Sequence, residues 1–283
     1  MKLIKGVTGL ILLIIALITL YYIVLRTPGD VYRAPERGAE QQATEKEAPS
    51  PVPDLPSRHR GSEAGKTTIA IIIDDIGFSL APLEKLLKID APLAFAILPY
   101  SPHAKAAAEM IHAQEHEILL HLPMEPHNKK YKPGQGGLFR NMTEQGILKQ
   151  LDDDLAAVPY AAGVNNHMGS AFMEDKDKLL VVLKYVQQKR LFFIDSRTTA
   201  ASQAQELARL TGIKFAARRL FLDNDQSRPL ILKTLFEHLD KNSNASMVII
   251  GHPYPATVAA LQEAVPQLRS QGIRMVPPSE IVK

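Results

Sequence analysis

Residues 69–78 read Ile69-Ala70-Ile71-Ile72-Ile73-Asp74-Asp75-Ile76-Gly77-Phe78. The first five are apolar and mostly β-branched, which is typical of a strand buried on both faces of a parallel sheet. Two adjacent carboxylates follow where this strand ends, and neighbouring negative charges repel each other. Such a pair is typically held by a cation or used to separate two pKa values. A turn or a helix N-cap is the alternative, because Asp also suits both.

Composition limits the classes of protein to consider. The chain has 283 residues, of which 46% are hydrophobic, so it can form one large or two small domains with a real core. Its formal net charge of +3 gives no general attraction for polyanions, and we expect no nucleic-acid partner. There are no cysteines, which excludes disulfides and thiolate metal sites. Any metal must therefore be held by His, Asp or Glu.

The first 26 residues predict a membrane anchor. Lys2 and Lys5 precede an uncharged run over residues 6–25, and Arg26 closes it. Twenty helical residues span about 30 Å, the thickness of a bilayer core. The run ends in bulky residues rather than a small-residue cleavage site, which favours an uncleaved signal anchor over a signal peptide. A buried core helix is the alternative. The positive-inside rule then predicts a single-pass inner-membrane protein whose remaining chain lies in the periplasm.

Residues 27–65 predict a linker. This segment is rich in Pro, Glu, Gln, Ser and Ala and has almost no periodic apolar residues. Such a composition is typical of a disordered tether. We therefore expect a disordered periplasmic linker over 27–65 and a folded domain over 66–283.

From residue 67 onward, apolar runs alternate with amphipathic stretches. Repeated β-then-α units predict parallel strands joined by right-handed crossovers. The expected fold is an α/β, distorted or incomplete (β/α) barrel of about seven strands, with a doubly wound sheet as the alternative. No Gly-rich loop follows any strand, so no nucleotide is expected. The strand-like runs are residues 68–73, 93–98, 117–122, 162–165, 191–194, 214–222, 247–250 and 274–276.

Polar residues repeatedly follow these runs. In a parallel barrel the carboxyl ends of the strands open on one face, and that face carries the active site. Six such endings from separate strands therefore predict one polar cluster. They are Asp74-Asp75, His121, Asn165-Asn166-His167, Asp195-Ser196-Arg197, Asp223-Asn224-Asp225 and His252.

The spacing around His121 indicates a metal site. Glu125 follows four residues later, and an Asp from a neighbouring strand would complete a set of three ligands that leaves room for water. A hydrogen-bonded polar cluster without metal is the alternative. His167 suits either a core role or the site. His252 lies between Gly251 and Pro253 in a rigid turn, which favours catalysis.

Several of these segments resemble the polysaccharide deacetylases of the NodB-homology type, and more closely their divergent, YibQ-like branch. The resemblance covers residues 67–283. It is carried by Asp74-Asp75, residues 116–126 (HEILLHLPMEP), residues 165–170 (NNHMGS), residues 193–196 (FIDS) and Gly251-His252-Pro253.

The resemblance implies roles for individual residues. It makes Asp74 the general base, Asp75 and His121 metal ligands, and His252 the late catalytic histidine. The family's second metal histidine corresponds to position 125, where this chain has Glu125. The arginine that orients the base in the family has no clear counterpart in this sequence.

The resemblance and the residues together predict a hydrolase that removes acetyl groups from N-acetylated sugars of a cell-envelope glycan. A catalytically degenerate glycan- or partner-binding barrel is the rival prediction. A divalent metal, with zinc favoured and manganese or iron as alternatives, is expected on Asp75 and His121 with Glu125 or His167. Predicted substrate contacts are Asn165, Asn166, Asp195 and Arg197.

Overall fold

The computed structural model describes residues 67–283. The predicted anchor (1–26) and linker (27–65) lie outside these described residues. Within residues 67–283, no helix is both long enough and apolar enough to cross a membrane. The fold described below is therefore that of the predicted catalytic domain.

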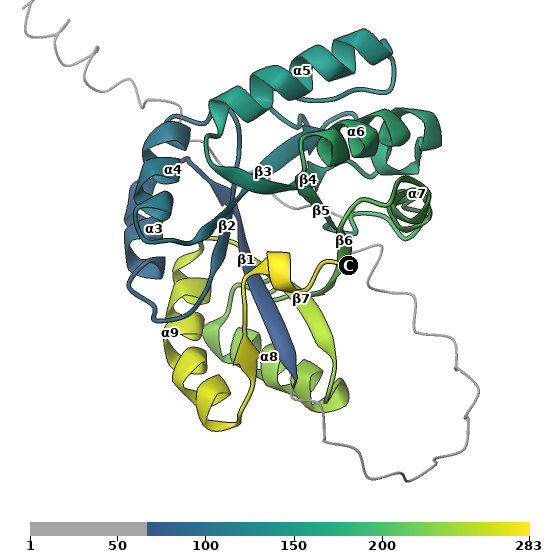
Figure 1. Ribbon diagram of the computed structural model, residues 1–283. Coiled ribbons are helices and arrows are strands. Elements are labelled where there is room, and N and C mark those ends of the chain that lie inside the picture. The colour runs from purple at the N-terminus through teal and green to yellow at the C-terminus, as the bar shows by residue number, and fades with distance from the viewer. Residues whose placement is uncertain (1–66) are drawn as a thin grey trace, which may run out of the picture. The chain divides into compact units, whose positions relative to one another are not determined.

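Seven parallel strands form a closed barrel (Figure 1). They follow one another in chain order from β2 to β7, and β1 pairs with both β7 and β2 and thereby closes the ring. The predicted (β/α) barrel is confirmed, and the doubly wound sheet is excluded because its edges would stay open. The strands are β1 (Thr68–Ile76), β2 (Ala94–Ile97), β3 (Glu117–Met124), β4 (Ala161–Met168), β5 (Phe192–Asp195), β6 (Phe215–Phe221) and β7 (Ser246–Gly251).

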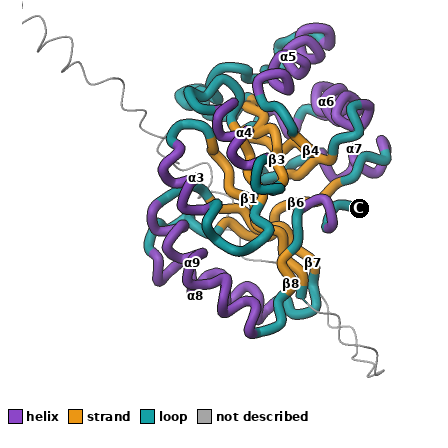
Figure 2. The backbone as a smooth tube through the Cα atoms, turned by 60° about the vertical axis from the view of Figure 1, so that its left-hand side comes forward, coloured by secondary structure: helices purple, strands orange, loops and turns teal. Residues whose placement is uncertain are grey.

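Helices surround the ring of strands, as Figure 2 shows. Each helix covers the barrel with an apolar face. In α6, for example, Leu179, Val182, Leu183 and Val186 recur at helical spacing and are all buried. The α-helices are α3 (Leu80–Leu86), α4 (Ala104–His112), α5 (Glu144–Ala157), α6 (Lys176–Gln188), α7 (Ala204–Thr211), α8 (Arg228–Lys241) and α9 (Pro255–Ser270).

The join between β1 and β2 is incomplete, and the end of the chain fills it. β2 pairs with β1 only from Ile72 onward, whereas the short strand β8 (Arg274–Met275) pairs with the first two residues of β1. Beyond β8 the chain crosses to β6, where Lys283 exchanges backbone hydrogen bonds with Phe215. The C-terminal segment therefore covers the end of the barrel at which the strands begin.

Side chains that point into the barrel change from apolar to polar along β1, β3 and β7. Residues two apart in a strand face the same side, so Ala70 and Ile72 share their direction with Asp74. In the same way Leu119 precedes His121, and Ile250 precedes His252. The apolar members form one buried cluster with Val276, Ile281 and Val282 of the C-terminal segment. The polar members lie at the opposite end, where the strands finish, which we call the mouth.

Asp75 reaches the mouth because its backbone departs from strand geometry. Its φ of 58° lies in the left-handed region, and the pairing of β1 with β2 is irregular between Ile73 and Ile76. In a regular strand Asp74 and Asp75 would point to opposite faces. A non-glycine residue in this conformation is uncommon and is often found at a functional site.

A candidate metal centre at the mouth of the barrel

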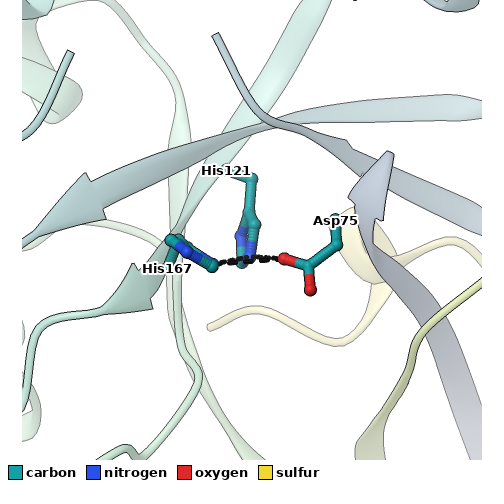
Figure 3. A group of neighbouring side chains, drawn as sticks. All are labelled: Asp75, His121 and His167. Carbon is teal, nitrogen blue, oxygen red and sulfur yellow. Dashed lines mark hydrogen bonds and ion pairs between the residues drawn. The ribbon is translucent and has the colours of Figure 1, made fainter. Parts of the chain in front are cut away.

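Three side chains from three strands bring donor atoms together at the mouth (Figure 3). Asp75 Oδ1 lies 3.2 Å from His121 Nε2 and 3.1 Å from His167 Nδ1. The two imidazole nitrogens are themselves 3.1 Å apart. Asp75 comes from β1, His121 from β3 and His167 from β4. Among the described residues, this is the group of His, Asp and Glu side chains that can hold a metal ion.

The donor set fits a divalent ion. Ligands that sit about 2.0 Å from zinc at tetrahedral angles lie roughly 3.3 Å from one another, close to the separations found here. His121 Nδ1 lies 2.8 Å from the side-chain oxygen of Asn165, which can only accept a hydrogen bond, so this nitrogen carries the proton. His121 Nε2 therefore presents its lone pair to the centre. Three protein ligands also leave a position for water.

Charge and burial shift the pKa values of the centre in opposite directions. Burial by itself would raise the pKa of Asp75, but hydrogen bonds from His121 and His167, with the charge of His252, hold that pKa well below its usual range. Burial would lower the pKa of His121, yet the carboxylates of Asp74 and Asp75 raise it. The site is thus built to hold positive charge next to Asp75.

Asn165 joins the two halves of the centre. This residue of β4 is completely buried. Its side-chain oxygen accepts from His121, and its side-chain nitrogen donates to Asp74 Oδ1 at 2.8 Å. A neutral amide therefore lies beside Asp74, where the family resemblance leads one to expect an arginine. Asn165 is also a predicted substrate contact, and both polar atoms of its side chain bind other residues of the protein.

His252 stands on the loop after β7 with its ring held by Asp223. His252 Nδ1 lies 2.8 Å from Asp223 Oδ1, and the backbone N–H of His252 donates to Asp223 Oδ2 at 2.6 Å. The Thr257 hydroxyl donates to the same oxygen, and all three residues are buried. Because a carboxylate accepts, Nδ1 carries a proton and Nε2 is left for other contacts. Asp223 belongs to the polar cluster predicted from the strand ends, but no catalytic or binding role was predicted for it.

Glu125 does not join the donor cluster. It follows the last residue of β3, and its carboxylate accepts the backbone N–H of Arg140 at 2.7 Å and faces the Arg140 guanidinium at 3.6 Å. The four-residue spacing from His121 carries position 125 beyond the end of the strand, where the chain turns away. Of the two predicted candidates for the third ligand, the structure brings His167 to the centre.

Two other predicted substrate contacts, Asn166 and Asp195, are held by hydrogen bonds at the ends of β4 and β5. Asn166 is buried and links the β4 and β5 ends, accepting from the backbone N–H of Ser196 and donating to the carbonyl of Met168. Asp195 accepts from the backbone N–H of Arg197 and from the Ser202 hydroxyl. Burial raises the pKa of Asp195. These contacts hold Asn166 and Asp195 in the wall of the mouth, and the substrate-binding roles of these two residues and of Arg197 stay predictions.

Arg218 of β6 supports the same wall. Its Nε donates to the carbonyl of Ser196 at 2.7 Å, and its guanidinium also donates to the carbonyl of Arg197. The guanidinium carbon lies 3.7 Å from the centre of the Phe221 ring, a cation–π contact. The sequence did not point to Arg218, because nothing in the residues around it distinguishes it from an ordinary surface arginine.

The arrangement provides the parts of a metal-assisted hydrolysis. A cation-binding centre, a buried carboxylate at Asp74 and an oriented imidazole at His252 all belong to one mouth. Asp74 Oδ2 is 3.7 Å from His121 Nε2, so this carboxylate lies directly beside the centre without being one of its three donors. This combination can catalyse the hydrolysis of an ester or an amide.

Comparison with known proteins identifies relatives of the chain. The sequence model of the family described as divergent polysaccharide deacetylase matches residues 71–282. The protein YibQ of Escherichia coli (strain K12) is 37% identical over 204 residues, which make up 71% of this chain and 63% of YibQ. The chain thus spans less than two thirds of the length of that relative.

Solved structures share the fold. The crystal structure of ATU2773 from Agrobacterium tumefaciens C58 matches with a TM-score of 0.73 at 21% identity, over 79% of this chain and 92% of that one. BA3943 of Bacillus anthracis, described as a CE4 family pseudoenzyme, matches with a TM-score of 0.51 at 13% identity, over 77% and 66% of the two chains. The match over residues 71–282, joined to the YibQ relationship, shows that the chain belongs to the divergent polysaccharide deacetylase family.

Proposed function

We propose that the protein is a metal-dependent hydrolase that removes acetyl groups from N-acetylated sugars of a cell-envelope glycan, with zinc as its metal. The observation that carries this proposal is the convergence of Asp75, His121 and His167 within hydrogen-bonding distance of one another, directly beside Asp74. Family membership supports the carbohydrate substrate.

The chain's own residues account for both proton transfers. Asp75, His121 and His167 would hold a divalent ion, which would supply Lewis-acid polarisation of the acetyl carbonyl and would lower the pKa of a water molecule. Asp74 accepts the proton of the attacking water, and Asn165 fixes the carboxylate in place for that task. The water oxygen forms a bond to the acetyl carbon.

His252 completes the reaction. It donates a proton from Nε2 to the sugar nitrogen as the carbon–nitrogen bond breaks, which gives acetate and a free amine. Asp223 holds the ring so that Nε2 can point toward the mouth and stabilises the imidazolium. The two groups thus divide the roles of base and acid between the β1 and β7 sides of the mouth.

The proposed location is the periplasmic side of the inner membrane. The apolar run over residues 6–25 supports a single span, and the lysines before it support an N-terminus in the cytoplasm. If this is correct, the protein in membrane fractions starts at its original N-terminus. A processed start near residues 26–33 would contradict the anchor.

Two measurements on the purified full-length chain test the proposed activity. Metal analysis should give one divalent ion per chain, and acetate should be released from N-acetylated oligosaccharides. Asp74→Asn should keep the ion and lose acetate release, whereas Asp75→Ala should lose both. Unchanged metal content in Asp75→Ala would place the metal elsewhere and overturn the proposal.

The rival function is a barrel that binds a glycan or a partner without chemistry. One observation favours it: a neutral amide, Asn165, stands beside the base in place of a charged arginine. BA3943, a pseudoenzyme, shows that this fold occurs without activity. Stoichiometric metal with no acetate release from any N-acetylated oligosaccharide would favour the rival.

A further inference from the structure

His167 lies at a point where its strand has lost one of its two neighbours. β4 continues beside β3 as far as the pairing of Met168 with Met124. On the other side, the pairing of β4 with β5 stops earlier, at Asn165 and Ile194. The backbone of His167 therefore has a parallel strand on one side only. A metal ligand must be held within about 0.5 Å of its productive geometry, so the open side needs another support.

The backbone also turns directly after His167. Met168 has a φ of 54° and Gly169 a φ of 88°, so two successive residues lie in the left-handed region. This conformation suits glycine, but it is uncommon and costs energy for methionine. A Cβ on Gly169 would lie 2.7 Å from Met124 Cβ, so the turn comes very close to the end of β3. The conformation of Met168 therefore depends on contacts that hold the turn.

The side chain of Asn166 supplies contacts on the β5 side. Its Oδ1 accepts the backbone N–H of Ser196, the first residue after β5, at 2.8 Å. Its Nδ2 donates to the carbonyl of Met168 at 2.8 Å and to the Thr198 hydroxyl at 3.3 Å. A primary amide has two N–H donors, so both are used. Asn166 thus continues, through its side chain, the connection between β4 and β5 that the backbone no longer makes.

Thr198 makes a second contact with the same turn. Its hydroxyl donates at 2.9 Å to the carbonyl of Met168, the oxygen that also accepts from Asn166. A carbonyl oxygen has two lone pairs, so these two donors complete its hydrogen bonding. Both side chains are buried, and removing a buried donor leaves its acceptor without a partner. The turn after His167 is therefore fixed by two side chains from two different segments.

The loop that carries Ser196 and Thr198 is itself held from β6. Arg218 donates to the carbonyl of Ser196 at 2.7 Å and to the carbonyl of Arg197 at 3.1 Å. Arg197 also has a left-handed φ, of 50°. These bonds fix the loop at its strained residue. Support thus runs from β6 through the loop after β5 to the turn after His167.

We infer that Asn166 and Thr198 are positioning residues that hold His167 Nδ1 at the candidate metal centre. They fix the turn directly after His167, and with it the direction from which the imidazole reaches Asp75 and His121 (Figure 3). Both act through the backbone of Met168. Removing a group that orients a metal ligand usually weakens metal binding by about 10- to 100-fold. The inference rests on the metal site of the proposed function.

Zinc affinity of the purified full-length chain tests this role in the absence of substrate. In competition with a chelating dye, Asn166→Ala should bind zinc at least about tenfold more weakly than the wild type. Thr198→Val, which removes the hydroxyl from a side chain of nearly the same shape, should change the affinity in the same direction. Thr198→Ser keeps the hydroxyl and should retain the wild-type affinity.

Thr143→Val is the matched control for a general loss of stability. The Thr143 hydroxyl caps α5 by accepting the backbone N–H of Gly146 at 3.1 Å. Its removal should lower the midpoint of thermal unfolding, because a helix loses its N-cap. Zinc affinity should stay the same. A positioning role for Thr198 therefore requires that Thr198→Val lowers the affinity and Thr143→Val does not.

NMR of the histidine ring nitrogens gives a second readout, in the metal-free protein. His167 Nδ1 lies 3.1 Å from both Asp75 Oδ1 and His121 Nε2, so its signal reports its place in the cluster. His167→Gln identifies the signal. Asn166→Ala and Thr198→Val should shift it, whereas Thr198→Ser should leave it in place.

The outcomes separate this inference from the proposed function. Unchanged zinc affinity and an unchanged His167 signal in folded Asn166→Ala and Thr198→Val overturn the positioning role, even if the wild type releases acetate. Equal loss of affinity in Thr198→Ser and Thr198→Val also overturns it, since the hydroxyl would then not matter. If the wild type binds no divalent ion, the hydrolase proposal fails, and the His167 signal still decides the positioning role. If Asn166→Ala does not fold, the two Thr198 variants decide.

Discussion

The two ends of this barrel use the same inward-facing strand positions for opposite purposes. At the end where the strands begin, Ala70, Val248 and their neighbours pack against Val276, Ile281 and Val282 of the C-terminal segment. At the mouth, further along the same strands, inward positions hold carboxylates, imidazoles and amides; Asp74 and His252 come four residues after Ala70 and Val248. The side chains at the closed end are apolar and need no counter-charge. The side chains at the mouth are polar or charged, although they are buried as well.

The difference separates stability from chemistry. Apolar burial stabilises the closed end by the hydrophobic effect. Buried charges at the mouth stabilise the protein only when a counter-charge is present, and they are destabilising if a partner is removed. Substitutions at the mouth should therefore change metal binding and rate, and substitutions at the closed end should change unfolding. Each prediction below tests this division, starting with the largest effect.

Removing a metal ligand should have the largest effect. We expect His121→Ala and His167→Gln to lose the metal and to reduce acetate release to background, because each removes one of three donors. Glu125→Gln is the matched control and should keep both, since Glu125 faces Arg140 instead. Metal analysis and acetate assays check this. Loss of metal in Glu125→Gln with retention in His167→Gln would reverse the assignment.

Removing the carboxylate that holds His252, the proposed general acid, should have the next largest effect. Asp223→Asn should lower kcat by about 10²- to 10⁴-fold, the usual contribution of general acid–base catalysis, because His252 loses its carboxylate partner. Metal content should not change. Asp225→Asn, on the same loop but exposed, should behave as the wild type. If Asp223→Asn alters metal content but not kcat, the Asp223–His252 pair serves the centre and not the proton transfer.

The buried carboxyl group of Asp154 should affect the free energy of unfolding in the opposite sense from the Asp75 carboxyl at the mouth, whose pKa is lowered. Burial raises the pKa of Asp154 to about 7. Between pH 4 and 7 the unfolded state has lost this proton while the folded state keeps it, so this group lowers the free energy of unfolding as pH rises. A shift of this size corresponds to roughly 4 kcal/mol.

Asp154→Asn should remove that pH dependence. Relative to the wild type, the variant should gain stability steadily from pH 4 to 7 and then level off. Urea unfolding at several pH values checks this, with the exposed neighbour Asp153→Asn as control. A constant difference between Asp154→Asn and the wild type over that range would contradict the raised pKa.

Asn165→Ala should weaken metal binding by about 10- to 100-fold, the usual cost of removing a group that orients a ligand. The substitution removes both the hydrogen-bond acceptor of His121 Nδ1 and the donor to Asp74 Oδ1. Competition with a chelating dye measures the affinity, and the exposed Asn141→Ala is the control. Unaltered affinity in a folded Asn165→Ala would show that the amide serves only packing.

The closed end should give the smallest effect and only on stability. Ile281→Ala should lower the free energy of unfolding by about 2 kcal/mol, at the low end for an isoleucine because the side chain keeps 8% exposure. Metal content and kcat should stay the same. Leu210→Ala, which is 68% exposed, should change neither. A drop in kcat for Ile281→Ala would break the separation between the two ends.

The barrel could be predicted because its strands are buried on both faces. A strand such as residues 68–73 then reads as a continuous apolar run, and the polar residue that follows marks its end. The gathering of Asp75, His121 and His167 also follows from topology, since all parallel strands finish at one end.

Individual contacts at the site could not be predicted, because they depend on residues far apart in sequence. Asp223 meets His252 across 29 positions, and Asn165 meets Asp74 across 91. The choice between Glu125 and His167 depended on where β3 stops, and a spacing of four residues does not reveal that. Strand-end position likewise does not show whether an amide faces the opening or a neighbouring strand, so the substrate contacts stay predictions.

The C-terminal segment has a practical consequence for handling the protein. Lys283 is bound beside the first residue of β6 and therefore lies at the closed end. A resin, sensor chip or fluorescent label joined at Lys283 leaves the mouth of the barrel facing solution. Samples immobilised in this way should present the candidate metal centre outward, which suits them to surface-based binding assays.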